Sequence, residues 1–264
     1  MPITPMFHVH AWGLPYVATM LGLKQVYPGR YDPEYLVELW RKEKVTFSHC
    51  VPTILQMLLN AKAAQGVDFG GWKIVIGGSA LNRSLYEAAK ARGIQLTAAY
   101  GMSETGPLVS CAHLNEELLA GSEDERTTYR IKAGVPVPLV EAAIVDADGN
   151  FLPADGESQG ELVLRAPWLS EGYFNEPQKG AELWEGGWMH TGDVATLDAF
   201  GVIDIRDRIK DVIKTGGEWI SSLALEDLVS RHPAVREVAV VGIADPQCGE
   251  RPFALLVVRE GHGI

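Results

Sequence analysis

The 264-residue sequence has few cysteines, no long apolar run and no excess of basic residues. Cys50, Cys111 and Cys248 stand far apart without metal-ligand spacing, which argues against a disulfide framework and fits a reducing cytoplasm. No apolar stretch reaches the ~20 residues that a membrane-spanning helix needs, and the start lacks the cationic region of a signal peptide. The formal net charge of −11 argues against a nucleic-acid partner, because phosphate contacts need clustered lysines and arginines. These absences leave a cytoplasmic globular protein.

The first hundred residues alternate between short apolar runs and helical patterns. Strands are predicted at residues 24–27, 45–49, 74–76 and 94–98, and helices from Pro33 onward, over 52–65 and over 82–92. Asp32 and Asn82 are suited to cap the free amides at helix starts, and Gly66 and Gly93 follow helix ends. Strand and helix alternate four times, which predicts a parallel sheet with flanking helices.

The pattern changes after residue 110. Residues 116–130 are polar, which predicts a mobile surface segment. Between residues 135 and 205, apolar and polar positions alternate with a period of two, interrupted by turns at Asp148-Gly149 and Phe200-Gly201. This alternation predicts a β-rich subdomain built of hairpins.

The last part of the chain has the pattern of a small α+β domain. A charged crossing at residues 207–211 precedes a strand, a turn, a helix over 222–232 and two further strands. The predicted fold class is therefore α/β, a parallel sheet with flanking helices followed by a β-rich subdomain and the start of a small domain. The predicted domain ranges are 1–130, 131–207 and 208–264.

Two segments of small residues follow strands of the predicted parallel sheet. Residues 77–80 read Gly-Gly-Ser-Ala, and residues 100–104 read Tyr-Gly-Met-Ser-Glu. Ligands bind beyond the carboxyl ends of the strands in such sheets, and glycines there allow the backbone to approach an anion. Ordinary strand-to-helix turns are the alternative interpretation, above all for the Gly77-Gly78 pair.

These segments belong to a series of five motifs. The series is Pro5-Met6-Phe7-His8, Gly77-Gly78-Ser79-Ala80, Tyr100-Gly101-Met102-Ser103-Glu104, His190-Thr191-Gly192-Asp193, and Asp207-Arg208-Ile209-Lys210-Asp211 followed by Gly216-Gly217-Glu218. In order and spacing it resembles the adenylate-forming enzymes, which include acyl-CoA synthetases, luciferases and the adenylation domains of peptide synthetases. The residues at 7–13 and 217–222 are most similar to those of medium- and long-chain fatty acid ligases and of ligases for short methylthio-substituted acids.

The resemblance implies a two-step reaction. A carboxylate attacks the α-phosphorus of ATP to give an acyl-adenylate and pyrophosphate, and coenzyme A then displaces AMP. By resemblance, Glu104 would ligate Mg²⁺, Ser103 would bind the α-phosphate, and His8 would gate the carboxylate tunnel. A solvated or capping acid is the alternative for Glu104, and a satisfied structural histidine is the alternative for His8.

The resemblance also assigns the nucleotide and coenzyme A contacts. Asp193 would accept both ribose hydroxyls, Arg208 would contact the ribose, and Tyr100 would stack on adenine. The implied nucleotide-binding set is Gly77, Gly78, Ser79, Tyr100, Gly101, Asp193 and Arg208. Lys210 would be the interdomain hinge, and the pantetheine tunnel would be lined by Lys214, Gly216 and Gly217.

Two further features bear on the substrate and on completeness. Residues 7–12 contain no acid, so the ammonium of an amino acid would lack a partner there and an apolar acyl chain is favoured. No Ser/Thr/Gly-rich phosphate loop precedes Pro5, and no lysine in a Gly-Lys context follows Val258.

The sequence therefore predicts a fragment of an ATP- and Mg²⁺-dependent acyl-CoA ligase, inactive alone. Its small-molecule partners would be a carboxylic acid, ATP and coenzyme A. It would form a homodimer, aggregate, or need a complementing amino-terminal half. A carrier-protein-loading adenylation domain and a nucleotide-binding module without catalysis stay open as alternatives.

Overall fold

The computed structural model describes residues 1–215, 218–261 and 263, which form two compact units. The first unit comprises Met1–Glu141, Ala166–Tyr173 and Phe200–Ile203. The second comprises Ala142–Arg165, Phe174–Ala199 and Asp204–Ile264. The chain crosses between the units several times, and the three consecutive domains of the sequence analysis stay a prediction.

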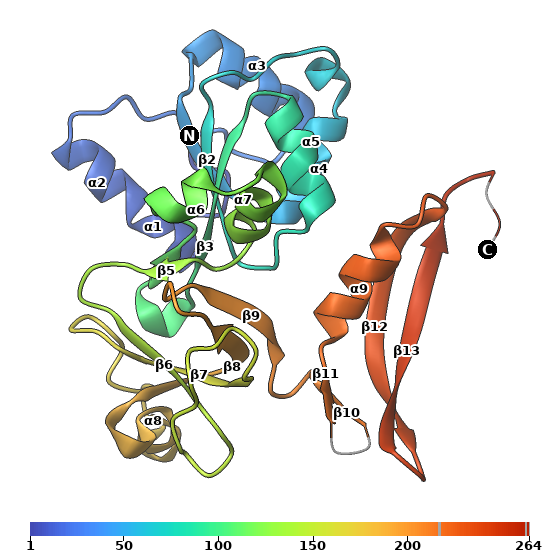
Figure 1. The fold of residues 1–264 in the computed structure, drawn as a ribbon. Helices are drawn as coiled ribbons and strands as arrows, with labels where there is room; N and C mark the ends of the chain where they lie inside the picture. The colour runs from blue at the N-terminus through green and yellow to red at the C-terminus, as the bar shows by residue number, and fades with distance from the viewer. Residues whose placement is uncertain (216–217, 262, 264) are drawn as a thin grey trace. The chain divides into compact units, whose positions relative to one another are not determined.

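A five-stranded sheet forms the centre of the first unit, in the order β1-β2-β3-β4-β5 (Figure 1). Its strands are β1 (Phe47–Cys50), β2 (Lys73–Ile76), β3 (Gln95–Tyr100), β4 (Ser110–Cys111) and β5 (Val135–Pro136). Strands β1, β2 and β3 are parallel, and β4 pairs antiparallel with both β3 and β5. The predicted parallel sheet is confirmed for the three strands that precede the candidate loops.

Helices α3, α4 and α5 accompany these strands, and two of them begin at capped positions. Their bounds are α3 (Pro33–Glu43), α4 (Pro52–Asn60) and α5 (Arg83–Ala91). The Asp32 side chain accepts hydrogen bonds from two first-turn amides of α3, and the Asn82 side chain accepts one in α5, as predicted. Because β1, β2 and β3 are neighbours in sequence order and parallel, the usual right-handed crossover puts α4 and α5 on the same face of the sheet.

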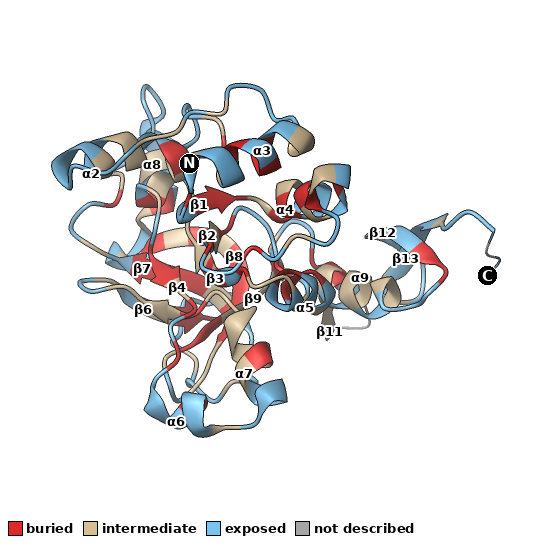
Figure 2. Ribbon diagram, turned by 90° about the horizontal axis from the view of Figure 1, so that it is seen from above, coloured by how far each residue is buried: buried red, intermediate tan, exposed pale blue. Residues whose placement is uncertain are grey.

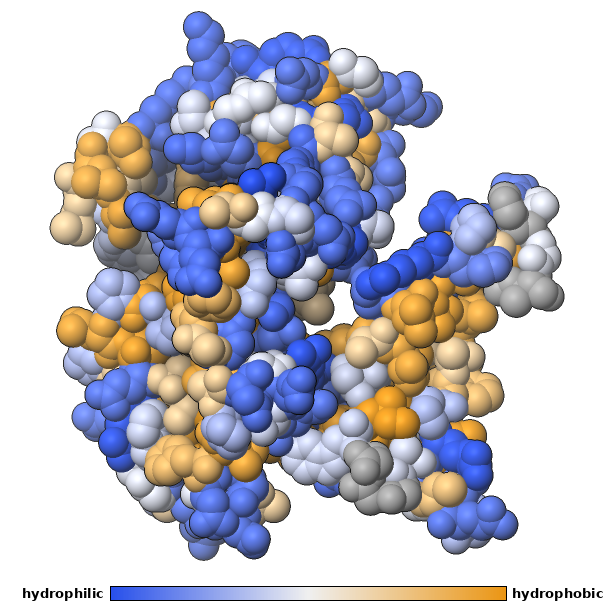
Figure 3. All heavy atoms as spheres, viewed as in Figure 1, coloured by the Kyte–Doolittle hydropathy of each residue, from blue (hydrophilic) through white to orange (hydrophobic). Residues whose placement is uncertain are grey.

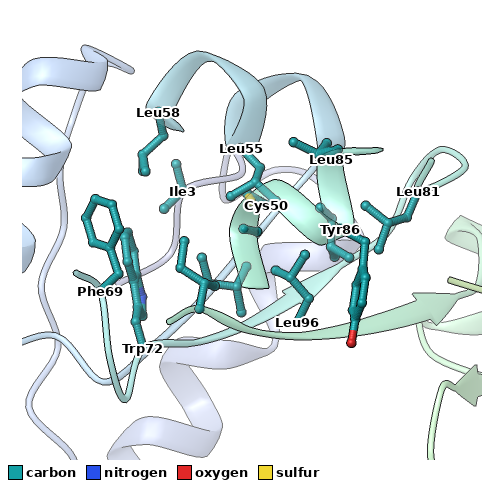
Figure 4. Packing of buried hydrophobic residues seen from close by; sticks show 14 of the residues in the cluster. Ile3, Cys50, Leu55, Leu58, Phe69, Trp72, Leu81, Leu85, Tyr86 and Leu96 are labelled. Carbon is teal, nitrogen blue, oxygen red and sulfur yellow. The ribbon is translucent and has the colours of Figure 1, made fainter. Parts of the chain in front are cut away.

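The core of the first unit lies between these helices and the strands (Figure 4). Leu55 and Leu58 from α4 and Leu85 from α5 point toward the sheet. The rings of Phe69 and Trp72 lie 5.5 Å apart between centroids and are fully buried. Each such side chain contributes roughly 1.5–3 kcal/mol through burial, so this core fixes the strand ends that carry the candidate loops.

Residues 24–27 do not form the predicted strand. The sheet edge beside β1 is taken by the amino-terminal residues, since Pro2 bridges His49 and the amide of Ile3 donates to the carbonyl of His49. Residues 24–27 instead line a cavity of about 420 Å³ together with α2 (Leu14–Met20) and the start of β1. This cavity is at the amino end of β1, away from the carboxyl ends of the parallel strands.

The predicted helix over 52–65 is shorter than its pattern suggested. Helix α4 ends at Asn60, and a 3-10 turn, η1 (Lys62–Ala64), follows the extended residue Ala61. The Glu34 carboxylate accepts hydrogen bonds from the amides of Lys62 and Ala63 at 2.7 and 2.6 Å. A side chain from α3 therefore satisfies amides that a continued helix would have paired internally.

The polar segment over 116–130 was expected to be mobile but forms two helices, α6 (Glu116–Ala120) and α7 (Glu123–Arg130). Ser122 and Glu125 make a capping box at the start of α7. Arg83 of α5 binds Asp124 at 2.6 Å and donates to Thr128 at 2.7 Å. These long-range contacts order a segment whose composition alone suggested mobility.

The second unit contains a four-stranded sheet in the order β6-β7-β8-β9. Its strands are β6 (Glu141–Val145), β7 (Gly160–Arg165), β8 (Met189–Leu197) and β9 (Ile203–Arg208). The predicted turns are present, since Gly149 and Gly201 have φ of 80° and 75°. Helix α8 (Pro177–Leu183) and the 3-10 turn η3 (Glu185–Gly187) interrupt the predicted run of hairpins between β7 and β8.

A second sheet, in the order β11-β10-β13-β12, carries helix α9 on β12. The elements are β10 (Ile213–Thr215), β11 (Glu218–Ile220), α9 (Ser222–Ser230), β12 (Val235–Asp245) and β13 (Gly249–Val258). Most of β12 and β13 is exposed (Figure 2), and hydrophobic side chains gather on the surface of this part (Figure 3). The exposed hydrophobic side chains of α9, β12 and β13 are Leu228, Val241, Ile243, Phe253, Leu255, Leu256 and Val257.

The remaining helical elements lie in the first unit. They are α1 (Val9–Trp12), in the amino-terminal segment, and the 3-10 turn η2 (Ser103–Thr105), which follows β3. None of the helices in residues 1–215, 218–261 and 263 combines the length and apolar character needed to cross a membrane.

Candidate active site

The loop after β2 passes close to the end of β3. Gly77 is buried, and a Cβ at this position would lie 2.7 Å from the carbonyl oxygen of Ala99 and 3.9 Å from Cε1 of His10. Gly78 has φ of 83°, and Ser79 is exposed. Gly77 is therefore required by the approach of two backbone segments and Gly78 by its left-handed conformation.

The loop after β3 is tighter still. A Cβ on Gly101 would lie 1.6 Å from the carbonyl oxygen of Pro107. The fully buried Thr105 hydroxyl accepts a hydrogen bond from the amide of Met102 at 2.8 Å and donates to the Pro107 carbonyl at 2.5 Å. The loop folds back on itself around this hydroxyl, which the sequence analysis did not single out, and presents Ser103 at its exposed tip.

A distant segment holds the half-buried Glu104 and its neighbour. The amide of Ser170 donates to the Glu104 carbonyl at 2.8 Å, and the indole of Trp168 donates to the Thr105 carbonyl at 3.1 Å. The Tyr173 hydroxyl donates to Oε1 of Glu104 at 2.7 Å. This hydrogen bond, with burial and the nearby carboxylate charge, raises the pKa of Tyr173 to about 12, so the phenol remains a donor.

Asp193 and Arg208 lie together in the second unit. Arg208 Nε is 3.6 Å from Asp193 Oδ1, and the side chains of Arg208 and Asp193 are 63% and 12% exposed. The Thr191 hydroxyl accepts from the amide of Asp193 at 3.1 Å and donates to the Leu162 carbonyl at 2.7 Å. The carboxylate is thus mostly buried on a fixed backbone, with an exposed cation beside it.

The Asp193 turn has a second support, Glu161 on β7. Its Oε2 lies 2.9 Å from Nδ1 of His190, and its Oε1 accepts from the amide of Gly192 at 2.9 Å. His190 and Gly192 belong to a motif of the sequence, whereas Glu161 belongs to none of the five. Only the pairing of β7 with β8 brings Glu161 to the turn.

The remaining sequence candidates are distributed along the second unit. Lys210 is exposed in the turn between β9 and β10, and Lys214 is exposed on β10. Gly216 and Gly217 lie outside the described residues. The buried Asp207 accepts from the amide and hydroxyl of Ser222 at 2.6 and 2.8 Å, and so connects the end of β9 to the start of α9.

The histidines of the first motif occupy different environments. His8 is exposed at the start of α1, and its ring lies 4.8 Å from the Phe7 ring between centroids, tilted by 32°. His10 lies 4.7 Å from the buried ring of His49, and Nδ1 of His49 is 3.2 Å from the Thr4 hydroxyl. The histidine next to the Gly77 loop is therefore His10. The gating role of His8 stays a prediction.

Acidification is expected to destabilise the first unit through His49. Burial, followed by the neighbouring His10, lowers the pKa of His49 to about 3. Because its ordinary pKa is 6.5, the unfolded chain binds a proton that the folded chain excludes, and stability falls as pH falls below about 6.5. We expect urea unfolding to show a loss of about 2 kcal/mol between pH 7 and pH 5.

A His49→Gln variant should lose most of this pH dependence, because glutamine does not titrate. His10, whose pKa burial also lowers, contributes in the same direction. A wild-type free energy of unfolding that stays constant over this pH range would contradict the expectation.

Glu104 is the acidic side chain to compare with the usual ligands of Mg²⁺. Within the described ranges, no three histidine, cysteine, aspartate or glutamate side chains form a cluster able to hold a metal ion. Mg²⁺ commonly uses one or two carboxylates together with substrate phosphates and water. Glu104, with one oxygen held by Tyr173, fits that single-carboxylate arrangement.

The loops after β2 and β3 lie in a part of the chain that matches a known protein family. Residues 1–174 match the family model described as AMP-binding enzyme. The chain belongs to this family. Residues 224–263 match its companion, AMP-binding enzyme C-terminal domain, so most of α9 and the whole β12–β13 hairpin fall within a second recognised module.

Individual relatives match along almost all of this chain. A long-chain-fatty-acid–CoA ligase of Thermus thermophilus is 44% identical over 98% of this chain and 48% of its own length. A 3-methylmercaptopropionyl-CoA ligase of Ruegeria lacuscaerulensis is 42% identical over 99% of this chain and 49% of its own length. The chain therefore spans about half the length of the curated relatives it matches.

Solved structures agree with the fold. The o-succinylbenzoate CoA synthetase of Bacillus subtilis, in complex with its acyl-adenylate intermediate, superposes with a TM-score of 0.81. It is 26% identical, and the match covers 99% of this chain and 51% of that chain. The α/β fold class is confirmed by this likeness.

Proposed function

We propose that this chain is part of an AMP-forming acid–thiol ligase, which activates a fatty acid with ATP and transfers the acyl group to coenzyme A. The identity to ligases for long- and medium-chain fatty acids, 44% and 39%, supports this assignment. The observation that carries it is the placement of Asp193, buried beside Arg208 on a fixed turn in a chain of the AMP-binding family.

Asp193 has the properties that ribose recognition needs. A carboxylate accepts hydrogen bonds from two neighbouring hydroxyls, and this one is held by backbone contacts with 12% of its side chain exposed. Arg208 supplies a cation whose Nε lies 3.6 Å from Oδ1 of Asp193. The proposed role of Tyr100 is to stack on adenine from the end of β3, where it is half-buried.

The loops after β2 and β3 are proposed to face the phosphates. Gly77, Gly78 and Gly101 keep the backbone free of side chains, and Ser103 offers an exposed hydroxyl. Glu104 would hold Mg²⁺, which when bound neutralises charge on the phosphates. In this assignment Tyr173 holds one Glu104 oxygen and so fixes the direction in which the other is presented.

The coenzyme A contacts and the carboxylate gate are assigned to exposed side chains. Lys214 is proposed to line the pantetheine path and Lys210 to act as the hinge, on the strength of their positions after β9. A gating role for His8 requires an exposed ring, which it has. We also propose the three consecutive domains, 1–130, 131–207 and 208–264, as the functional parts.

The acid is proposed to be a fatty acid, because α1 and α2 contain no acidic residue that could pair with an ammonium group. The 42% identity to 3-methylmercaptopropionyl-CoA ligases favours a short methylthio-substituted acid as the second candidate. The exposed apolar side chains of α2 and β13 support association with a second copy or with a complementing segment. The free thiols of Cys50, Cys111 and Cys248 support a reducing cytoplasm.

A chimera tests this function. This chain would replace the matching part of the Thermus thermophilus ligase, and pyrophosphate release would be measured with octanoate, 3-methylthiopropionate and a panel of α-amino acids. We expect octanoate to react fastest and every amino acid to remain near the blank. A preference for 3-methylthiopropionate would select the second candidate, and a preference for an amino acid would refute both.

A further inference from the structure

The segment that carries Asp193 is a bulge in the β7–β8 pairing. Glu161 is opposite Val194 and Val163 is opposite His190, with an irregular register between them. Strand β8 thus takes four residue steps, from His190 to Val194, where β7 takes two. A bulge of this kind redirects a side chain and leaves backbone groups without ladder partners. Asp193 is on this redirected stretch.

Side chains satisfy the amides that the ladder leaves unpaired. The amide of Gly192 donates to Glu161 at 2.9 Å, and the amide of Asp193 donates to the Thr191 hydroxyl at 3.1 Å. The Gly192 carbonyl accepts from the amide of Ile209 at 2.9 Å. Gly192 itself has φ of 71°, a left-handed conformation that glycine adopts without steric cost. Hydrogen bonds to its amide and its carbonyl hold it in the bend.

Glu161 is the charged member of this set, and both of its oxygens are used. One accepts from Gly192, and the other is 2.9 Å from Nδ1 of His190, whose Nε2 is 3.3 Å from the Glu185 carbonyl. The Glu161 and His190 side chains are 20% and 25% exposed, so solvent competes little for these contacts. Glu161 thereby fixes both His190, at the start of the bulge, and Gly192, directly before Asp193.

We propose that Glu161 is a positioning residue for ribose recognition, acting on Asp193 through Gly192 and His190. The inference rests on the proposed function, in which Asp193 accepts the ribose hydroxyls. Without the Glu161 carboxylate, a partly buried amide loses its acceptor and the bulge relaxes. Asp193 then no longer meets two hydroxyls with correct geometry, although its own carboxylate is unchanged.

The test measures binding of AMP and of 2′,3′-dideoxy-AMP to the 264-residue chain by calorimetry. The ratio of the two dissociation constants isolates the ribose hydroxyls from all other contacts. Each charge-assisted hydrogen bond lost corresponds to about a tenfold or greater change in affinity, so we expect wild type to prefer AMP at least about tenfold. Asp193→Ala should abolish this preference, and its ratio of dissociation constants is the value with which the Glu161 variants are compared.

Glu161→Ala is expected to reduce the preference to within about threefold of the Asp193→Ala value, while dideoxy-AMP affinity stays near wild type. Glu161→Gln retains an oxygen that can accept from Gly192 and should give an intermediate ratio; it also provides the test if the alanine variant does not fold. Glu157→Ala removes an exposed acid just before β7 and should behave as wild type.

Two outcomes overturn the inference and are distinguishable. If wild type prefers AMP and the Glu161 variants keep that preference, Glu161 is a structural residue only, and the proposed role of Asp193 stands. If wild type binds AMP no better than dideoxy-AMP, the ribose role of Asp193 fails, and the positioning role fails with it.

Discussion

Replacing Gly101 with alanine is expected to lower the free energy of unfolding of the first unit by about 3 kcal/mol or more, the upper range for overpacking. The added Cβ would lie 1.6 Å from the Pro107 carbonyl oxygen and 2.9 Å from the Thr105 hydroxyl. Both atoms belong to the hydrogen-bonded loop after β3, so the clash cannot be relieved by rotating a flexible side chain. Urea unfolding at pH 7, followed by circular dichroism, measures the change.

Gly13→Ala is the matched control. Gly13 has φ of −74°, and a Cβ there would meet no atom within 4 Å. The same chemical change should therefore alter stability by less than about 1 kcal/mol. An unfolding midpoint for Gly101→Ala equal to that of Gly13→Ala would show that the loop does not have the described conformation.

Gly101 also illustrates what sequence reasoning can recover. The motif identified the glycine, and the strand before it was predicted, because β3 is an apolar run bounded by clear turn signals. The same local signals located α3 and α5 through Asp32 and Asn82, whose side chains cap the helices as predicted. The reason for Gly101, the return of the chain at Pro107, depends on a loop conformation with no such local signature.

Supporting contacts between distant residues were the part that the sequence did not predict. Tyr173 meets Glu104 across 69 residues, and Glu161 meets Gly192 across 31. Nothing near Tyr173 or Glu161 marks either as part of a site, because each gains its role from tertiary pairing. A sequence motif therefore does not reveal the residues that reach a loop only through tertiary pairing.

Two wrong predictions about the fold also arise from contacts between distant residues. The segment over 116–130 was expected to be mobile from its polarity, yet Arg83 binds it from a helix that lies 41 residues away in the sequence. Residues 24–27 have the composition of a strand, but the edge of β1 is occupied by residues 2 and 3. Local composition states what a segment could form, and tertiary partners decide between the possibilities.

Glu104→Gln is expected to reduce pyrophosphate release by about 10²–10³-fold in the chimera with the Thermus thermophilus ligase, the usual cost of removing one preorganised electrostatic contact. Glutamine keeps the size of the side chain and one oxygen but removes the charge that suits Mg²⁺. The Mg²⁺ concentration for half-maximal rate should therefore rise. The rates are compared at saturating octanoate, so that weaker binding of the acid does not contribute to the measured loss of rate.

Tyr173→Phe separates the effect of the Glu104 charge from the effect of its orientation. The variant removes only the hydroxyl that donates to Oε1 and leaves the carboxylate in place. We expect a smaller rate loss, about tenfold, since the carboxylate keeps its charge but loses one hydrogen bond. Electron paramagnetic resonance of Mn²⁺ with ATP should show weakened metal binding in both variants, and more strongly in Glu104→Gln. A Glu104→Gln rate within about threefold of wild type, with unchanged Mn²⁺ binding, would remove Glu104 from the metal site and leave Tyr173 a structural contact.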